Sequence, residues 1–447
     1  MPGTLTGVSV VVAGAGLAGL SAARALVRRG AAVTVVEARQ RVGGRVWTVR
    51  DGFIDGQHAE AGGDMIDQAH GAIRTLAEEL GLPLVRILSK GFAFARPDAR
   101  GRVRIIKPTA NRGWAHLAHA LAPLSHAYRL AERRWDTPIA TELASLSVAQ
   151  WLDDCGADQD LRETARGLRG FFLADPEQLS MLALVDQFST DLVSERHYRI
   201  EGGNDRLPQA LAAELGDRVQ LGTELLAITH RGKRVRVALK HQREAFELQA
   251  DYMVCTLPAS LLRRIPITPS LPARQREAVA KVAYGQGTKT LLQFGRRFWV
   301  KPGRPRAFGS ALPHGAVWDG NEEQRGPMGI LTLLAGGSAS EQTADIVDRD
   351  GIEGLTRSLD WLGSRDETAI ASKQVRWEAE PWSRGGYAVF DSTFDPALRA
   401  WLALPHGRVF FAGEHTSTTW QGYMNGAVES GQRAAAEVVA THRLGRG

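Results

Sequence analysis

The chain contains little cysteine, little lysine and no long apolar run. Its only thiols, Cys155 and Cys255, are too few for a disulfide framework or a cysteine metal site, and they fit a reducing, cytoplasmic location. No apolar run approaches the length that spans a bilayer, so no membrane partner is expected. Only eight of the 55 basic residues are lysines, and because acids interleave with the arginines, the net charge of +6 does not favour a nucleic-acid partner.

A nucleotide-binding pattern opens the chain, whose 447 residues are enough for two domains. An apolar run, three spaced glycines and a run of small residues predict a strand, a tight turn and a helix over residues 8–29. Gly14 permits the turn, Gly16 lets a pyrophosphate approach the helix N-terminus, and Gly19 lets the helix pack against the sheet. Glu37 ends a second apolar run and can accept the ribose hydroxyls of an adenosine, so the pattern predicts a dinucleotide site.

The next segment narrows the choice of dinucleotide. Residues 38–48 carry Arg39, a second glycine pair that ends at Gly44, and then Arg45. An arginine on a glycine-flexed loop can reach phosphate oxygens through a forked, charge-assisted contact. The run at 41–45, Arg-Val-Gly-Gly-Arg, resembles the flavin-binding signature of the flavin-containing amine oxidases. The resemblance implies FAD as the cofactor, with Arg39, Gly44 and Arg45 among its contacts.

The resemblance covers nearly the whole chain and is weakest between about 90 and 195. It implies an α/β fold, in which a Rossmann-type FAD-binding domain carries an inserted α+β substrate-binding domain. Both domains are expected to be discontinuous. The FAD-binding domain is assigned to 1–85, 196–262 and 396–447, and the substrate-binding domain to 86–195 and 263–395. Within the first insertion, helices are predicted at 115–130, 147–152, 161–172 and 180–188.

A further glycine pair, Gly62 and Gly63, resembles the family's loop beside the flavin ring. L-amino-acid oxidases of this superfamily carry an arginine shortly after the pair, where it holds the substrate carboxylate. This chain has Asp64 and Asp67 there instead, and Asp67 falls where polyamine oxidases can carry a carboxylate that faces a second amine. The two acids are therefore candidate substrate contacts for a diamine or polyamine. The alternative is that they are loop or helix-capping acids.

Further positions are assigned from the resemblance in the second half of the chain. Leu225 falls where a small apolar residue of the family contacts the adenine of FAD. Trp382 lies in a loop that resembles a flavin-contacting loop of the monoamine oxidases. In that loop Gly386 stands where the monoamine oxidases have the cysteine joined to FAD, so the cofactor is expected to be non-covalent. Lys289, in an apolar strand, falls where the family's lysine holds a water against flavin N5. The alternative for Lys289 is a strand lysine whose ammonium reaches solvent.

The C-terminal segment carries the most specific motif. A strand ends in Gly413 and Glu414, and the last helix opens after Gly422, with Tyr423 and Met424 at its start. The N-terminus of that helix can stabilise negative charge at the N1–C2=O edge of a reduced flavin. Tyr423 and Tyr387 match the tyrosine pair that frames the substrate amine, and Trp420 lies nearby as a weaker substrate candidate. The alternative for both tyrosines is core packing.

The activity that the resemblance implies is FAD-dependent amine oxidation. A neutral amine would dock between Tyr387 and Tyr423, pass a hydride to flavin N5 and leave as an imine for hydrolysis, while oxygen becomes hydrogen peroxide. Lys289 would assist reoxidation or orient the hydrolytic water. A homodimer would be in keeping with the family. The competing hypotheses are an L-amino-acid oxidase-like enzyme, a flavin-dependent desaturase or dehydrogenase with another electron acceptor, a non-redox flavin isomerase, and a non-catalytic FAD-binding scaffold.

Overall fold

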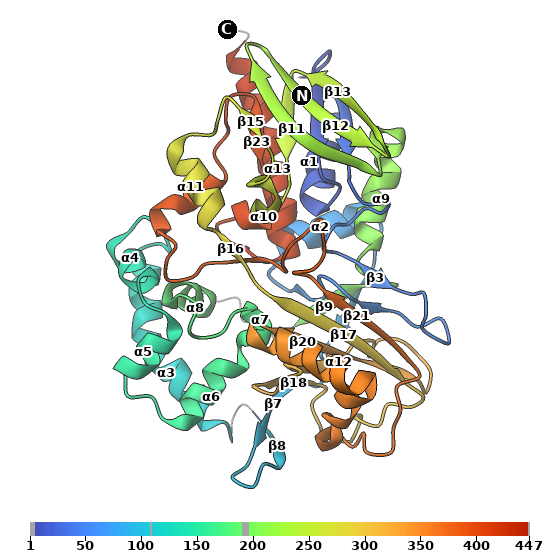
Figure 1. Ribbon diagram of the computed structural model, residues 1–447, viewed down its shortest axis with the longest axis vertical. Coiled ribbons are helices and arrows are strands. Elements are labelled where there is room, and N and C mark those ends of the chain that lie inside the picture. Colours follow the sequence, from blue (N-terminus) through green and yellow to red (C-terminus); the bar gives the residue numbers. More distant parts are fainter. Residues whose placement is uncertain (1–4, 108–109, 190–195, 446–447) are drawn as a thin grey trace.

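A parallel five-stranded sheet occupies one end of the molecule (Figure 1). The computed structural model describes residues 5–107, 110–189 and 196–445. The strand order of this sheet is β10-β2-β1-β14-β23. Its strands are β1 (Ser9–Ala13), β2 (Ala32–Val36), β10 (Val219–Gln220), β14 (Tyr252–Cys255) and β23 (Val409–Phe411). Every one of these strands comes from the segments assigned to FAD binding, although the boundaries between the two domains stay predictions.

Helices cover one face of the parallel sheet. They are α1 (Leu17–Val27), α2 (Gly71–Glu79), α9 (Arg206–Leu215) and α13 (Met424–Leu444). Because side chains alternate along a strand, Val10 and Val12 pack into the core with these helices, whereas Val11 and Ala13 belong to a second core on the opposite face. The start of α1 and the start of α13 therefore lie against the same sheet.

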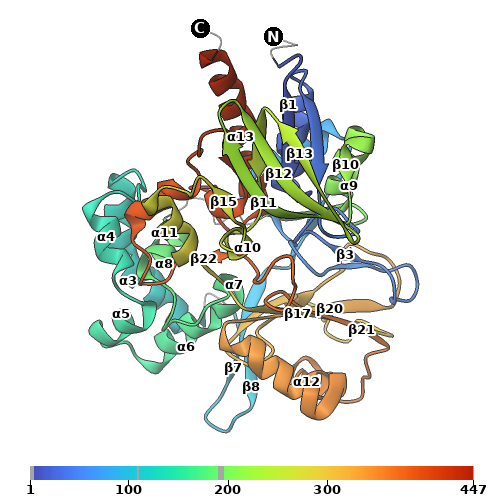
Figure 2. The same ribbon diagram turned by 45° about the horizontal axis from the view of Figure 1, so that its top comes forward.

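A meander covers the opposite face of the parallel sheet, as Figure 2 shows. Its strands are β11 (Thr223–Arg231), β12 (Arg234–His241), β13 (Glu244–Ala250) and the short β15 (Ile267–Thr268). Val235 and Val237 point into the shared core, whereas Arg234 and Arg236, which alternate with them, are exposed. This alternation places Arg234 and Arg236 on the solvent-facing side of β12.

A seven-stranded sheet forms the other end of the molecule, in the order β21-β17-β20-β19-β18-β7-β8. Its strands are β7 (Phe92–Pro97), β8 (Val103–Ile106), β17 (Gly287–Phe294), β18 (Ala307–Ser310), β19 (Ala316–Asp319), β20 (Gly329–Gly336) and β21 (Ala371–Arg376). Helix α12 (Ser338–Arg357) packs on one face through a core that includes Leu355, Phe294 and Leu333. All of these strands come from the segments assigned to substrate binding.

A group of helices, seen at one side in Figure 2, follows β8 in the chain. It comprises α3 (Arg112–Leu130), α4 (Pro138–Ala144), α5 (Val148–Asp154), α6 (Gln159–Gly167), α7 (Arg169–Phe172) and α8 (Met181–Phe188). Side chains cap five of their N-termini, including a capping box at Ser147. The single helix predicted over 161–172 is wrong in one respect, because the chain breaks at Leu168 into α6 and α7.

The region that the sequence assigned to helices also contains strands. Both β7 and β8 lie within it, and β7 pairs with β18 some two hundred residues later in the chain. A strand whose partner is so distant leaves little local pattern, which explains why it was missed.

Short strands connect the two ends of the molecule. They are β3 (Thr48–Val49), β4 (Ala59–Glu60), β5 (Ile66–Asp67), β6 (Leu84–Ile87), β9 (His197–Ile200), β16 (Ala283–Tyr284) and β22 (Ala388–Val389). Two short helices, α10 (Ala259–Leu262) and α11 (Ala273–Lys281), follow β14. In the described part of the chain, none of the helices is both long enough and apolar enough to cross a bilayer.

Candidate active site

A cavity of about 960 Å³ reaches from the parallel sheet to the seven-stranded sheet. All but one of the predicted site residues line it. Those at the walls are Gly14, Gly16, Glu37, Arg39, Gly44, Arg45, Gly62, Gly63, Asp64, Asp67, Leu225, Lys289, Trp382, Tyr387, Gly413, Glu414, Trp420, Gly422, Tyr423 and Met424. Gly19 is the exception. It lies behind the turn, where a Cβ would sit 1.9 Å from the carbonyl oxygen of Gly14, so its role is to let α1 pack closely.

The turn between β1 and α1 leaves room for a ligand to approach the main chain. Gly14 has a φ of +103°, and a Cβ there would lie 2.5 Å from the Thr256 hydroxyl oxygen. Gly16 faces Gly44 closely enough that a Cβ on Gly44 would lie 3.6 Å from the Cα of Gly16. No side chain caps the N-terminus of α1. This uncapped helix start between two glycine loops has the chemistry of a pyrophosphate cradle.

Glu37 lies at the end of β2 with its carboxylate fixed by the main chain. One oxygen accepts a hydrogen bond from the N–H of Ala15 (2.9 Å) and the other from the N–H of Arg39 (2.9 Å). Because a carboxylate oxygen can accept more than one hydrogen bond, both oxygens can still take a ribose hydroxyl. The two main-chain contacts fix the direction of the carboxylate.

Arg39 joins the first nucleotide loop to the loop around Trp382. Its guanidinium donates to the hydroxyl of Ser383 (2.9 Å) and to the carbonyl oxygen of Trp382 (3.4 Å), and it lies 3.4 Å from the carboxylate of Glu380. Leu225, on β11, contributes an apolar wall and is 6% exposed. These residues come from three distant segments and meet at the same end of the cavity.

Arg45 and Glu414 form an ion pair in the wall of the cavity. Arg45 Nη1 lies 2.9 Å from Glu414 Oε1 and 2.5 Å from the carbonyl oxygen of Gly386. The other oxygen of Glu414 accepts the N–H of Gly422 at 2.9 Å. Glu414 thereby connects the glycine loop of the N-terminal motif to the start of α13, where Tyr423 is the N-cap residue and no side chain caps the helix.

Lys289 points into the protein rather than to solvent, so the surface alternative is wrong. Its side chain is 4% exposed, and Nζ donates to the carbonyl oxygen of Gly62 (3.0 Å) and to Asp64 Oδ2 (2.9 Å). The ammonium also lies 5.0 Å from the centre of the Trp318 ring. Burial lowers the pKa of Lys289, and the ion pair with Asp64 opposes that shift.

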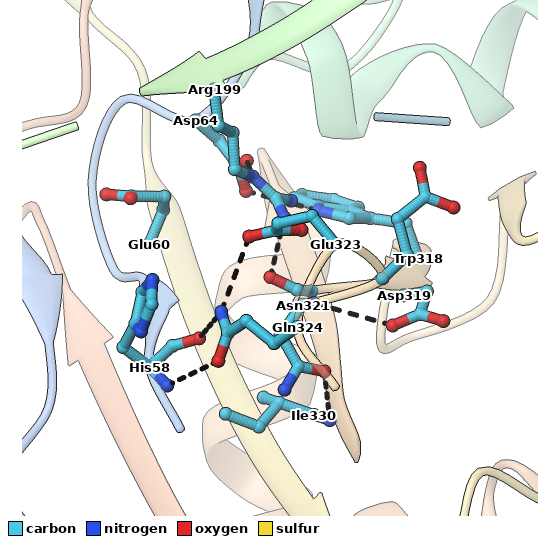
Figure 3. Close-up of polar contacts among 12 residues, drawn as sticks. His58, Glu60, Asp64, Arg199, Trp318, Asp319, Asn321, Glu323, Gln324 and Ile330 are labelled. Carbon is cyan, nitrogen blue, oxygen red and sulfur yellow. Dashed lines mark hydrogen bonds and ion pairs between the residues drawn. The ribbon is translucent and has the colours of Figure 1, made fainter. Parts of the chain in front are cut away.

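Asp64 is fully engaged by protein groups. Arg199 donates to one oxygen at 2.6 Å, while Lys289 and the indole N–H of Trp318 share the other. Figure 3 shows Arg199 beside Asp64, with Glu323 close by. A carboxylate with two cationic partners and an indole donor has little capacity left for a substrate ammonium. The geometry therefore disfavours the substrate contact that the sequence suggested for Asp64.

Tyr387 and Tyr423 line the same cavity, with Trp420 beside Tyr423. The Tyr423 hydroxyl donates to Gln187 Oε1 at 3.2 Å, and the Tyr387 hydroxyl donates to the carbonyl oxygen of Phe171. The rings of Trp420 and Tyr423 meet edge to face at 5.9 Å. Burial raises the pKa of Tyr423 to about 12 and raises that of Tyr387 as well, so both phenols are neutral at physiological pH.

Asp67 is held between two histidines. Its Oδ1 lies 2.7 Å from His197 Nδ1, and its Oδ2 lies 3.5 Å from Nε2 of the buried His70. The His70 ring in turn meets the edges of Trp420 (4.6 Å) and Tyr423 (5.0 Å). Asp67 thus reaches the cavity wall next to the tyrosine, with part of its hydrogen-bonding capacity already used.

Four of the aromatic side chains that line the cavity lie next to one another. Phe92 and Phe94 on β7, Trp114 on α3 and Phe188 on α8 form a chain of rings whose centres lie 5.6 to 6.3 Å apart. We call these four residues the aromatic cluster. It gives the cavity an apolar portion that no predicted site residue had indicated.

Comparison with known proteins identifies the family. A sequence model described as flavin containing amine oxidoreductase matches residues 17–439 of the chain. The chain belongs to this family. A putative flavin-containing monoamine oxidase, AofH, of Mycobacterium tuberculosis is 28% identical over 97% of both chains. A double mutant of putrescine oxidase, made to redesign cofactor binding, has a TM-score of 0.85 at 25% identity and covers 98% of this chain and 99% of that one. Cyclohexylamine oxidase of Brevibacterium oxydans shares the fold, with a TM-score of 0.83 at 24% identity over 97% and 99% of the two chains.

FAD is therefore the cofactor of this amine oxidase, and the cavity fits it. The uncapped start of α1 and the fixed carboxylate of Glu37 suit a pyrophosphate and a ribose. Gly62 lets its loop pack against the backbone of the Arg45 loop in the cavity wall, since a Cβ on Gly62 would lie 1.9 Å from the Arg45 carbonyl oxygen. The second uncapped helix start, at α13, can face the flavin.

Several residues of this amine oxidase site had no signal in the sequence. Gln187 and the aromatic cluster come from the segment that matched the family least, and His197 and Arg199 lie just after that segment, on β9. Each looks like an ordinary strand or helix residue in its own neighbourhood. Only the three-dimensional pairing of β9 with β5 brings His197 and Arg199 next to the acidic loop.

Proposed function

We propose that this protein oxidises an amine to an imine, which water hydrolyses, with oxygen as the electron acceptor and hydrogen peroxide as the second product. The observation that carries the proposal is the convergence of Lys289, Tyr387, Tyr423 and the start of α13 on a single cavity that also contains the nucleotide cradle. Bound FAD supplies the acceptor for the hydride and the route of the electrons to oxygen. Gly386 in place of a cysteine supports non-covalent binding.

The two tyrosines would orient the amine and keep it neutral. Their phenols are protonated, so they carry no charge that would hold the substrate as an ammonium ion by an ion pair. Their hydroxyls are tied to Gln187 and to the Phe171 carbonyl, which fixes both rings. Fixed aromatic faces favour an amine over an anion and exclude water from the carbon that reacts.

The aromatic cluster supports an amine with an apolar substituent as the first candidate substrate. The partial engagement of Asp67 by His197 supports the same choice, because a second ammonium would compete with the histidine for that carboxylate. A diamine is the second candidate. Its support is the position of Asp67 at the cavity wall and the 25% identity to a putrescine oxidase.

Anaerobic mixing of the flavin-loaded protein with amines and amino acids tests the proposal. We expect phenylalkylamines or cycloalkylamines to bleach the oxidised flavin absorbance, and air to restore it with release of hydrogen peroxide. Bleaching by amino acids would favour the amino-acid oxidase alternative. Restoration by an artificial acceptor but not by air would favour a dehydrogenase. If no amine bleaches the flavin, the oxidase proposal is wrong.

Lys289→Met and the double variant Tyr387→Phe, Tyr423→Phe sharpen the test. We expect Lys289→Met to keep FAD and lose most of the turnover with oxygen. If the double variant oxidises amines at the native rate, the two hydroxyls have no role in the reaction, and only the aromatic rings of Tyr387 and Tyr423 can contribute. The cytoplasmic location and the homodimer stay predictions, to be checked by cell fractionation and by light scattering.

A further inference from the structure

Four charged side chains form a buried row behind the candidate active site. In order they are Lys289, Asp64, Arg199 and Glu323, with separations of 2.9 Å, 2.6 Å and 3.0 Å between successive pairs. The side chain of each of the four residues is at most 14% exposed. The signs alternate, so every charge in the row has an opposite charge beside it.

The inner members of the row are held rigidly. Arg199 also donates to the carbonyl oxygen of Gly320 at 2.7 Å, and Asp64 takes a third hydrogen bond from the indole of Trp318 at 3.1 Å. The amide of Asn204 donates to the main-chain carbonyl of Asp64 at 2.8 Å. Figure 3 shows Arg199, Asp64 and Trp318 converging from separate elements. Asp64 therefore presents its Oδ2 to Lys289 in one fixed direction.

Two of the three N–H groups of the Lys289 ammonium have acceptors in the protein. Of its three N–H groups, one points to Asp64 and one to the carbonyl oxygen of Gly62. The third is available to the cavity that Lys289 lines. Without Asp64, the ammonium would keep only a neutral carbonyl partner and would face Arg199, a like charge, in a buried site.

We infer that Asp64 is a positioning residue, anchored by Arg199 and Trp318, that holds the Lys289 side chain as an ammonium and aims its remaining N–H into the cavity. The inference rests on the proposed function, since it matters only where Lys289 serves the flavin site. It replaces the substrate contact first expected of Asp64.

The charged groups around Lys289 define how the site responds to pH. Asp64 and Glu60 face it from the segment that runs from β4 to β5, and Arg199 faces it from β9, with Glu323 behind Arg199. Asp64 is ionised throughout the working range, because Arg199 and Lys289 outweigh the effect of burial and keep its pKa below the usual value. Glu60 titrates near neutral pH and makes the ammonium more favourable as pH rises.

Asp64→Asn tests the inference, since it removes the charge and preserves the shape. The measurements are the absorbance of the oxidised flavin as a function of pH, and the rate at which air reoxidises enzyme reduced with dithionite. We expect Asp64→Asn to gain a titration that depends on Lys289, because a buried lysine without its carboxylate partner loses its proton at a lower pH than the paired lysine does. Glu60 titrates in native enzyme as well, so only the change that disappears when Lys289 is replaced is assigned to the lysine. Above that titration, reoxidation is expected to fall to the Lys289→Met rate, roughly tenfold or more below native enzyme.

Two control variants distinguish the loss of the Asp64 charge from structural damage to the site. Trp318→Phe removes another hydrogen bond from the same carboxylate oxygen while keeping both charges and an aromatic face, so no new titration is expected. The double variant Asp64→Asn, Lys289→Met should lose the new titration. Where Asp64→Asn does not retain FAD, Asp64→Ser is measured in its place.

The inference is overturned if the Asp64 variants show the native pH profile, or if their new titration survives the removal of Lys289. Neither measurement uses an amine, so the outcome is independent of the substrate panel. A failure of the proposed function appears as an unbleached flavin with amines, whereas a failure of this inference appears only in the pH profiles of dithionite-reduced and oxidised enzyme.

Discussion

Arg45 and Glu414 are 369 positions apart in the chain, yet their side chains meet at 2.9 Å inside the cavity. Glu414 is 7% exposed at its side chain, and it also accepts the N–H of Gly422. One ion pair thus joins the N-terminal glycine loop to the start of the last helix.

Arg45→Ala is expected to lower both stability and FAD content. Removing one partner leaves Glu414 as a buried, uncompensated charge, which costs about 3–5 kcal/mol in comparable sites. Thermal unfolding and the flavin-to-protein absorbance ratio provide the measurements. The matched control is Arg28→Ala, whose side chain is 55% exposed and whose loss should shift neither value appreciably. Equal effects of the two substitutions would contradict the role given to Arg45.

The two glycines of the loop before Asp64 should differ in their tolerance of a methyl group. A Cβ on Gly62 would lie 1.9 Å from the Arg45 carbonyl oxygen, which is backbone and cannot move alone. A Cβ on Gly63 would meet only the flexible side chain of Met424, at 2.8 Å from its sulfur. We therefore expect Gly62→Ala to abolish FAD retention and Gly63→Ala to reduce it mildly. Gly71→Ala, with nothing near the added atom, is the control.

Glu60 should make the protein less stable as pH rises from about 4.5 to about 7. Burial, followed by repulsion from Asp64, raises its pKa from 4.5 to about 7. An acid with a raised folded-state pKa stabilises the fold below its unfolded pKa, and this contribution is lost as pH rises through the folded pKa. At about 1.4 kcal/mol per pH unit, the loss between pH 4.5 and 7 is about 3 kcal/mol.

Glu60→Gln is expected to remove this part of the pH dependence. Denaturant unfolding of native protein and of the variant, at pH values on either side of the window, gives the comparison. Glu244→Gln, on an exposed strand, is the control for the loss of one carboxylate. A variant that still loses stability as steeply as native protein would assign the pH dependence to another group.

Trp114→Ala should change which amines are accepted. Trp114 lies 5.6 Å, ring centre to ring centre, from both Phe94 and Phe188, so its loss opens the centre of the aromatic cluster. Removing a large apolar contact costs about 1.5–3 kcal/mol, which is roughly a tenfold or greater rise in KM for a phenylalkylamine. Short aliphatic amines should be affected less. Steady-state peroxide release with both substrates measures the difference, and equal changes would place the substrate elsewhere.

The sequence predicted those parts of the site whose residues are neighbours in the chain. The turn at Gly14, the close packing at Gly19 and the acid at Glu37 belong to one strand-helix-strand unit, where spacing alone fixes their geometry. Lys289 was predicted from the resemblance to the family, and its burial is in keeping with the apolar strand that carries it.

The buried charge row could not be predicted in the same way. Asp64, Arg199 and Glu323 are separated by more than a hundred residues from one another, and no local pattern states which acid will meet which base. Strand β7 was missed for a related reason, since its partner β18 lies far along the chain. Pairings of this kind depend on the whole fold rather than on the segment that contains each residue.

The order of the parallel sheet also determines when the nucleotide domain can form. Strand β23, at its edge, and helix α13, which packs on α1, come from the last forty residues of the chain, whereas β1 and α1 come from the first thirty. During synthesis the N-terminal motif therefore stays partly unpaired until β23 and α13, about four hundred residues later, have left the ribosome. Contacts of such high sequence separation slow folding and leave apolar strands open to aggregation. A chain truncated before β23 should consequently accumulate in inclusion bodies rather than as a flavin-binding fragment.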